Sequence, residues 1–195
     1  MKYVPNVLTI GRIVVTPILL ALLFLDTLSG QGAALVLFIL AAISDYFDGK
    51  LARSLGARSR LGQFLDPMAD KVLVLGTFTA LAFLIPQIVP WWAVALIALR
   101  DVVVTALRMW AESQGRTLRT IPMAKTKTTL QLVFLIGILV MLTARHLPGV
   151  LAEVALWVLS SVIPFILLMA VVALTLYTGV WYVLKKDYVS PAQFN

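Results

Sequence analysis

Residues 33–53 read AALVLFILAAISDYFDGKLAR, a long apolar run that ends among aspartates. A membrane-spanning helix needs about 20 mostly apolar residues, and this stretch has that length. Similar runs lie near residues 7–25, 67–86, 90–111, 124–144 and 154–184, separated by short breaks rich in turn-forming residues. The pattern predicts an all-α integral membrane protein, with residues 1–195 forming a single domain that is a bundle of six transmembrane helices.

The composition supports this class and excludes several others. The 195 residues are 61% hydrophobic and only 13% charged, with a mean hydropathy of +0.98. A soluble domain carries roughly 25% charged residues, so a soluble, disordered or nucleic-acid-binding protein is excluded. The chain has no cysteine, which excludes disulfide and thiol chemistry. The first run contains Arg12 and no clear cleavage site, which indicates a retained helix and not a signal peptide.

The basic residues predict the orientation in the membrane. Six spans place both termini on one side, and if that side is the cytoplasm, 15 of the 16 Lys and Arg residues are cytoplasmic, with Arg145 as the exception. Lys and Arg are enriched in cytoplasmic loops, so both termini are predicted to be cytoplasmic. Aromatic residues are then expected to lie at the two membrane interfaces: Trp91 and Trp92 outside, and Tyr3, Trp181, Tyr182 and Tyr188 inside.

The sixth run is longer than a bilayer requires. Its 31 residues would form a straight helix of about 46 Å, against a hydrocarbon core of roughly 30 Å. We therefore expect Pro164 to kink this helix, or its ends to project into water.

Four of the nine acidic residues fall within 26 residues of sequence. Asp45 and Asp48 are spaced i and i+3 at the end of the second run, and Asp66 and Asp70 are spaced i and i+4 at the start of the third. Each pair therefore shares one helical face. The loop between the runs is short, which predicts that the two helices are antiparallel neighbours and bring the four carboxylates together.

Four neighbouring carboxylates repel one another and lose hydration in a membrane, so they need a counterion of high charge. Two divalent cations would supply it, and an all-oxygen ligand set without His or Cys favours Mg²⁺ or Mn²⁺ over Zn²⁺. The structural alternative is that Asp66 caps a helix and that Asp45 and Asp48 form ion pairs with nearby cations, which are Lys50, Arg53 and Arg58.

The two acidic segments together read D-x2-D-G-x2-A-R-x8-G-x3-D-x3-D over residues 45–70. This pattern resembles the signature of the CDP-alcohol phosphatidyltransferase family, and every fixed position and both gaps match. Further segments look like those of family members that use sn-glycerol 3-phosphate as the acceptor: Asn6-x2-Thr9-x2-Arg12, Arg100-Asp101, Ala106-Leu107-Arg108 and residues 124–129.

The resemblance implies a homodimeric enzyme that transfers the phosphatidyl group of CDP-diacylglycerol to sn-glycerol 3-phosphate and releases CMP. It also implies roles by position. Asp45, Asp48, Asp66 and Asp70 would hold two metal ions, and Asp70 would also be the general base. The head group of CDP-diacylglycerol would be contacted by Asn6, Thr9, Gly49, Arg53 and Ser59. A donor with two acyl tails stays in the bilayer, so the site would lie at the cytoplasmic leaflet.

Elementary chemistry is compatible with these roles. Two metal ions can clamp a pyrophosphate and stabilise charge on the attacking and leaving oxygens. Gly49 and Ala52 have almost no side chain, which would let a nucleotide approach the helix, and Arg53 offers a fork for phosphate. The alternative for the small residues is close helix packing.

A dianionic acceptor needs converging cations, whereas serine or inositol would need mostly hydrogen bonds. Arg100 is the most informative candidate because it lies near mid-span, where a charge is costly unless it pairs or binds an anion, and its neighbour Asp101 is expected to point elsewhere. The predicted acceptor-phosphate residues are Arg100, Arg108, Arg119, Lys125 and Lys127. If both lysines are helical they face opposite ways, so at most one reaches the pocket.

These cations could instead have structural roles, and other functions of the protein stay open. Arg108 could pair with Glu112, and the two lysines could contact anionic lipid. A sister transferase could use inositol phosphate, serine or phosphatidylglycerol as the acceptor. Intramembrane carboxylates also mark ion pathways, so a non-enzymatic ion transporter is the rival of a different class. The acids gather at one leaflet, which argues against a transport pathway.

Overall fold

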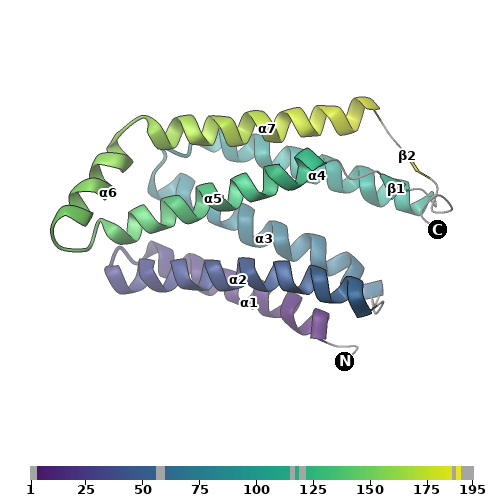
Figure 1. Cartoon of the computed structure of the whole chain (residues 1–195), viewed down its shortest axis with the longest axis horizontal. Coiled ribbons are helices and arrows are strands. Elements are labelled where there is room, and N and C mark those ends of the chain that lie inside the picture. The colour runs from purple at the N-terminus through teal and green to yellow at the C-terminus, as the bar shows by residue number, and fades with distance from the viewer. Residues whose placement is uncertain (1–3, 56–59, 115–116, 119–121, 186–187, 190–195) are drawn as a thin grey trace.

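The computed structural model is almost entirely helical (Figure 1). It describes the backbone of residues 4–55, 60–114, 117–118, 122–185 and 188–189, and the side chains of residues 11–44, 71–111, 113–114 and 126–184. The helices are α1 (Val4–Phe24), α2 (Leu28–Leu55), α3 (Arg60–Leu84), α4 (Trp91–Ser113), α5 (Pro122–Ala144), α6 (Val150–Ser160) and α7 (Ile163–Lys185). The predicted all-α class is confirmed.

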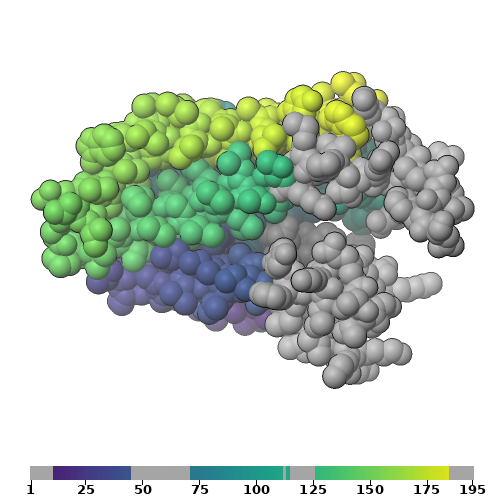
Figure 2. All heavy atoms as spheres, in the orientation of Figure 1, coloured from purple at the N-terminus to yellow at the C-terminus, as the bar shows by residue number. Residues whose placement is uncertain are grey.

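The long helices run alongside one another, and α6 crosses one end of them at a steep angle (Figure 1). α1 packs against both α2 and α3, while α5 packs against α2 and α7. α7 also packs against α4. The ends of α2 and α3 that carry the four aspartates have no described side chains, so the expected approach of these two ends stays a prediction. Figure 2 shows α5 and α7 side by side along one face, with α6 at one end of both.

The sixth predicted helix is two helices, which corrects the expectation of one kinked span. Ser161 has an extended backbone (φ −79°, ψ 168°) and its Oγ accepts a hydrogen bond from the backbone N–H of Ile163 at 3.3 Å. Pro164 then falls in the first turn of α7, where its missing N–H costs nothing. The helix therefore breaks before the proline, and α6 is about 16 Å long, too short to cross a bilayer.

Short polar residues start α2 after a tight turn. The Oγ1 of Thr27 accepts a hydrogen bond from the backbone N–H of Gly30 at 3.1 Å, which is the geometry of an N-cap. A Cβ on Gly30 would lie 2.7 Å from the Cβ of Leu25 and 2.9 Å from its carbonyl oxygen. Only glycine therefore lets α1 turn so closely into α2.

The outward surfaces of the helices are apolar. Large side chains such as Phe83, Leu99 and Val133 are more than 60% exposed. Exposed apolar side chains in such number, on every long helix with described side chains, are unfavourable in water and typical of lipid contact. Among the described residues, two segments are long and apolar enough to cross a membrane by length and composition, Thr126–Ala144 and Ile163–Leu184.

A minimal antiparallel ladder joins two distant segments at one end of the molecule. β1 (Thr117–Leu118) pairs with β2 (Tyr188–Val189), with Thr117 opposite Val189 and Leu118 opposite Tyr188. The segment that follows α7 thus contacts the connection between α4 and α5. The sequence pattern predicted no strand here, because two residues are too few to show a periodicity.

Candidate active site

The four predicted metal ligands lie on helices that begin or end at the same end of the molecule. α2 is helical through Asp45 and Asp48, and α3 is helical through Asp66 and Asp70, so the i, i+3 and i, i+4 spacings are real. Four residues of chain separate the two helices, which limits the distance between their ends to roughly 18 Å. The donor set of four carboxylates fits two hard divalent cations such as Mg²⁺ or Mn²⁺.

The side chains of this acidic motif lie outside the described residues. The same holds for the predicted donor-binding residues: Asn6 and Thr9 on α1, Gly49, Ala52 and Arg53 on α2, and Ser59 between α2 and α3. Two predicted acceptor residues, Arg119 and Lys125, also lie outside. In the part of the chain with described side chains, no group of three or more Asp, Glu, His or Cys residues is placed to hold a metal ion.

Three predicted acceptor residues have described side chains, and two of them meet at Asp101. One oxygen of its carboxylate, Oδ1, accepts hydrogen bonds from Lys127 Nζ at 2.6 Å and from Arg100 Nη1 at 3.0 Å. The side chains are 9%, 6% and 11% exposed for Asp101, Lys127 and Arg100. We call these three residues the buried ion network. The expectation that Asp101 points away from Arg100 is wrong, because the long arginine side chain bends back to its neighbour.

The rest of the Arg100 guanidinium is held by α7. Its Nε donates to the carbonyl oxygen of Thr175 at 3.2 Å, and its Nη2 donates to Thr178 Oγ1 at 2.9 Å. Three of its five N–H groups are therefore used within the protein. Gly179 makes room for the side chain, because a Cβ there would lie 2.7 Å from Arg100 Cγ.

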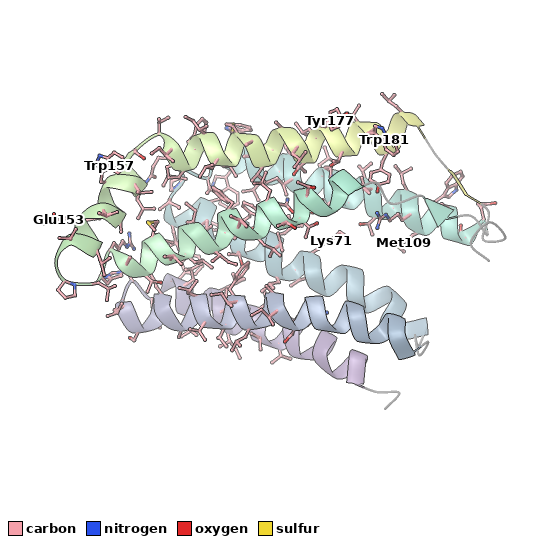
Figure 3. The ribbon with its side chains drawn as sticks, viewed as in Figure 1. Lys71, Met109, Glu153, Trp157, Tyr177 and Trp181 are labelled. Carbon is pink, nitrogen blue, oxygen red and sulfur yellow. The ribbon has the colours of Figure 1, made fainter. Side chains whose placement is uncertain are left out.

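Arg108 lies two turns further along α4, or about 12 Å. Its Nη2 donates to the hydroxyl of Tyr182 at 3.3 Å, and its guanidinium carbon lies 5.6 Å from the centre of that ring. Its Nε is buried and has no hydrogen-bond partner among the described residues. Tyr182 is 2% exposed, so its ring is buried within the protein, while its predicted level at the membrane interface stays a prediction. Tyr177 and Trp181 are on the same half of α7 (Figure 3), where Tyr177 is exposed.

An apolar groove of about 260 Å³ lies between α4 and α7, outside the ion network. Among the described residues Arg100 is its one charged lining residue, and the others are Leu96, Leu99, Val103, Val104, Leu176, Gly179, Val180, Val183 and Leu184. The Arg100 side chain thus has one face against an apolar groove and its polar end against α7.

The opposite end of the molecule carries a smaller polar cluster. The carboxylate of Asp26 pairs with Arg145 and lies 3.2 Å from His146 Nε2, which joins the α1–α2 turn to the end of α5. Glu153 and Trp157 of α6 lie at this same end (Figure 3). This cluster is far along the helices from the ion network and contains the sole histidine.

Sequence reasoning missed Asp101, Thr178 and Tyr182 as partners of the acceptor cations. One signal was available, because a carboxylate within an apolar helix needs a cation, and Lys127 lies near the start of the next helix. No comparable signal marks Thr178 or Tyr182, since threonine and tyrosine are common in membrane helices for other reasons.

The sequence was compared with known proteins. The profile of the family described as CDP-alcohol phosphatidyltransferase matches residues 2–184. CDP-diacylglycerol--glycerol-3-phosphate 3-phosphatidyltransferase 1, chloroplastic/mitochondrial, of Arabidopsis thaliana is 38% identical over 144 residues, covering 67% of this chain and 48% of the relative. A second Arabidopsis thaliana protein of the same name, numbered 2, is 37% identical over 145 residues and covers 67% and 61%.

A bacterial relative is covered more fully. CDP-diacylglycerol--glycerol-3-phosphate 3-phosphatidyltransferase of Escherichia coli (strain K12) is 35% identical over 142 residues, or 70% of this chain and 76% of the relative. By contrast, the chain spans only about half to three fifths of the length of the two plant relatives.

Proposed function

The chain belongs to the CDP-alcohol phosphatidyltransferase family, and from this we propose that it transfers the phosphatidyl group of CDP-diacylglycerol to sn-glycerol 3-phosphate. The acceptor hydroxyl oxygen would attack the phosphorus that carries the diacylglycerol. The bond from that phosphorus to CMP would break, and the products would be phosphatidylglycerophosphate and CMP. The observation that carries the proposal is the complete acidic motif of residues 45–70 within a chain whose relatives are named for this acceptor.

We assign the reaction centre to the acidic motif. Asp45, Asp48, Asp66 and Asp70 would hold two Mg²⁺ or Mn²⁺ ions, which when bound supply positive charge to the pyrophosphate. Asp70 would also accept the proton of the attacking hydroxyl. A carboxylate is the reasonable base, because the sole histidine, His146, is at the other end of the helices, next to Asp26.

The donor lipid would be held on the same two helices and on α1. Gly49 and Ala52 would let the nucleotide approach the backbone of α2, and Arg53 would bind a phosphate. Further contacts would come from Ser59, Asn6 and Thr9. The acyl tails would stay in the cytoplasmic leaflet and enter laterally between helices.

The acceptor phosphate would be bound by cations of α4, α5 and their connection: Arg100, Arg108, Arg119, Lys125 and Lys127. The described geometry supports different contributions from these cations. Arg108 has a buried Nε without a described partner, so it would donate more hydrogen bonds to the phosphate than Arg100. Arg100 keeps two N–H groups and contributes its charge. Of the two lysines, Lys127 is the one with a described inward side chain.

We further propose that six of the seven helices span the membrane with both termini in the cytoplasm. α1 to α5 and α7 have 21 to 28 residues each, which is long enough, and α6 would lie at the outer interface. The distribution of basic residues supports this orientation. The protein would be a homodimer in a bacterial cytoplasmic membrane, with residues 1–195 as one domain.

The deciding experiment is an acceptor panel with purified protein, CDP-diacylglycerol and Mg²⁺. We expect CMP release with sn-glycerol 3-phosphate and little with inositol phosphate, serine or phosphatidylglycerol. Asp70→Asn and omission of the divalent cation should each abolish release. Transfer to another acceptor in preference to glycerol 3-phosphate would refute the assignment, and metal-independent activity would refute the two-metal site.

A further inference from the structure

Asp101 is a buried acid that the proposed chemistry does not use. Its Oδ1 accepts from two cations on two helices, Arg100 on α4 and Lys127 on α5. Carboxylates inside a membrane protein are costly and need such partners. Asp101 thus holds cations from two helices at one oxygen atom, in a region where all three side chains are largely shielded from water.

The contact between Asp101 and Lys127 links two helices that otherwise pack on a third. α4 and α5 each pack on α7, whereas they are not main packing partners of each other within the described residues. The 2.6 Å contact between Lys127 and Asp101 therefore spans from α5 to α4 directly. Lys127 lies about one and a half turns from the start of α5. Its contact with Asp101 therefore holds the start of α5, which carries the proposed acceptor cations Lys125 and Lys127, against α4.

Asp101 contributes unequally to the positions of the two cations. Arg100 is also held by Thr175 and Thr178 of α7, so it would keep its place without the carboxylate. Lys127 is a flexible ammonium that is held close to a second cation, and like charges repel. The shared oxygen of Asp101 offsets this repulsion and keeps the Lys127 ammonium beside the Arg100 guanidinium.

We infer that Asp101 is a positioning residue for the acceptor phosphate, acting through Lys127. It sets where the second cation stands relative to Arg100 and does not itself touch substrate. The inference rests on the proposed function, since it takes glycerol 3-phosphate as the acceptor whose phosphate meets these cations.

The test is a double-mutant cycle between Asp101→Asn and Lys127→Met, read as the KM for glycerol 3-phosphate. Each single variant should raise this KM about tenfold, the worth of one charge-assisted hydrogen bond, and leave the KM for CDP-diacylglycerol unchanged. The double variant should resemble Lys127→Met alone, because Asp101 acts through the lysine. Asp101→Glu should restore part of the loss.

Asp26→Asn is the matched control, because Asp26 also pairs with an arginine on another element but lies at the opposite end of the helices. It should leave the KM for glycerol 3-phosphate unchanged. If Asp101→Asn fails to fold, Asp101→Glu, which keeps the charge but moves the carboxylate, is measured with Lys127 present and in the Lys127→Met background. A rise in the KM for glycerol 3-phosphate only where Lys127 is present supports the inference. No rise with Lys127 present, or the same rise in both backgrounds, overturns it.

Several outcomes separate this inference from the proposed function. If the wild-type protein does not use glycerol 3-phosphate, the function fails before any variant is made. If the wild type uses it but Asp101→Asn changes no KM, or changes KM for both substrates alike, only the positioning role fails. Thermal stabilisation of each variant by glycerol 3-phosphate, measured without the donor lipid, gives a second readout that should be weakened by Asp101→Asn.

Discussion

At the scale of single residues, a large cation inside the helix bundle needs space as well as hydrogen-bond acceptors. Arg100 illustrates this, because its side chain reaches Thr175 and Thr178 only where Gly179 leaves space beside it. A glycine on a neighbouring helix is thus as much a part of the arginine site as the groups that accept its hydrogen bonds.

Gly179→Ala should therefore destabilise the protein. The added Cβ would stand 2.7 Å from Arg100 Cγ and force the guanidinium away from α7, at a cost of about 1–3 kcal/mol typical of overpacking. Gly137→Ala on α5 is the control, because a Cβ added there would meet nothing within 4 Å among the described residues. Thermal unfolding in detergent should show a lower Tm for the first variant and not for the second; equal Tm values would contradict this account.

Arg108→Ala should weaken acceptor binding. The variant removes a guanidinium that Tyr182 holds in place and whose buried Nε has no hydrogen-bond partner among the described residues. The KM for glycerol 3-phosphate should therefore rise roughly 10- to 100-fold. Steady-state kinetics with both substrates varied would measure it. Arg145→Ala removes a cation at the other end and should have no such effect. An unchanged KM in Arg108→Ala would remove this residue from the acceptor site.

The sequence was sufficient to nominate these cations but not to pair them. Arg100 stands out in the sequence because it is a charged residue in the middle of an apolar run. Arg108 is eight residues later, which places it near the same face of the helix. Neighbours along a helix point about 100° apart, so the contact between Arg100 and Asp101 depends on how far a long side chain bends. The burial of Tyr182 could not be predicted, because an exposed and a buried tyrosine at the end of an apolar helix have the same local sequence.

At the scale of elements, the ends of helices were harder to predict than their existence. All six apolar runs are helical, but the last one also includes α6, which a break at Ser161 separates from α7. Hydropathy does not register that break, because Ser160 and Ser161 are only two residues within a long apolar run. The extended backbone at Ser161 ends α6, and Pro164 lies in the first turn of α7. From the sequence alone, a proline that starts a new helix cannot be distinguished from one that kinks a continuous helix.

The β1–β2 ladder is the element with the most direct link to the proposed acceptor site. β1 lies between α4 and α5, in the segment that carries Arg119, and β2 holds it from the far end of the chain. Removing residues 187–195 should raise the KM for glycerol 3-phosphate a few-fold and leave that for CDP-diacylglycerol unchanged, because the connection loses its partner strand. Removing residues 190–195 alone keeps β2 and should be silent.

If both truncations behave alike, the ladder has no influence on acceptor binding. If the longer truncation affects the two substrates equally, its effect is on folding and not on the acceptor site. The comparison needs only activity assays in which each substrate is varied in turn.

At the scale of the whole molecule, the helices form a bundle whose two ends have different chemistry. One end carries the acidic motif, the β1–β2 ladder and most of the cations, and the other carries Asp26, Arg145 and α6. The asymmetry could be predicted from the sequence, because it follows from counting charges along alternating spans. The packing order of the helices could not, since equally apolar helices give no signal of which neighbour each prefers.

The absence of cysteine allows a direct test of the orientation. A single cysteine at Glu153 of α6 should react with a membrane-impermeant thiol reagent added to intact cells. A cysteine at Gln114, just beyond α4, should react only after the cells are permeabilised. Both positions are exposed, so access to the reagent decides the result. Reversed labelling would invert the topology, and labelling of both sites in intact cells would refute a membrane crossing by α5, which lies between them.

The contact between Arg100 and α7 also has a consequence for biosynthesis. The hydroxyl that Arg100 Nη2 binds belongs to a residue 78 positions later in the chain. At a synthesis rate of about 5–20 residues per second, α4 is made roughly 4–16 s before Thr178 exists. During that interval the arginine has only Asp101 beside it, and Lys127 joins them 26 positions after Asp101. The last helix therefore completes a polar centre that the earlier helices leave incomplete, and a chain released before α7 is made would lack the Thr175 carbonyl and the Thr178 hydroxyl that hold Arg100.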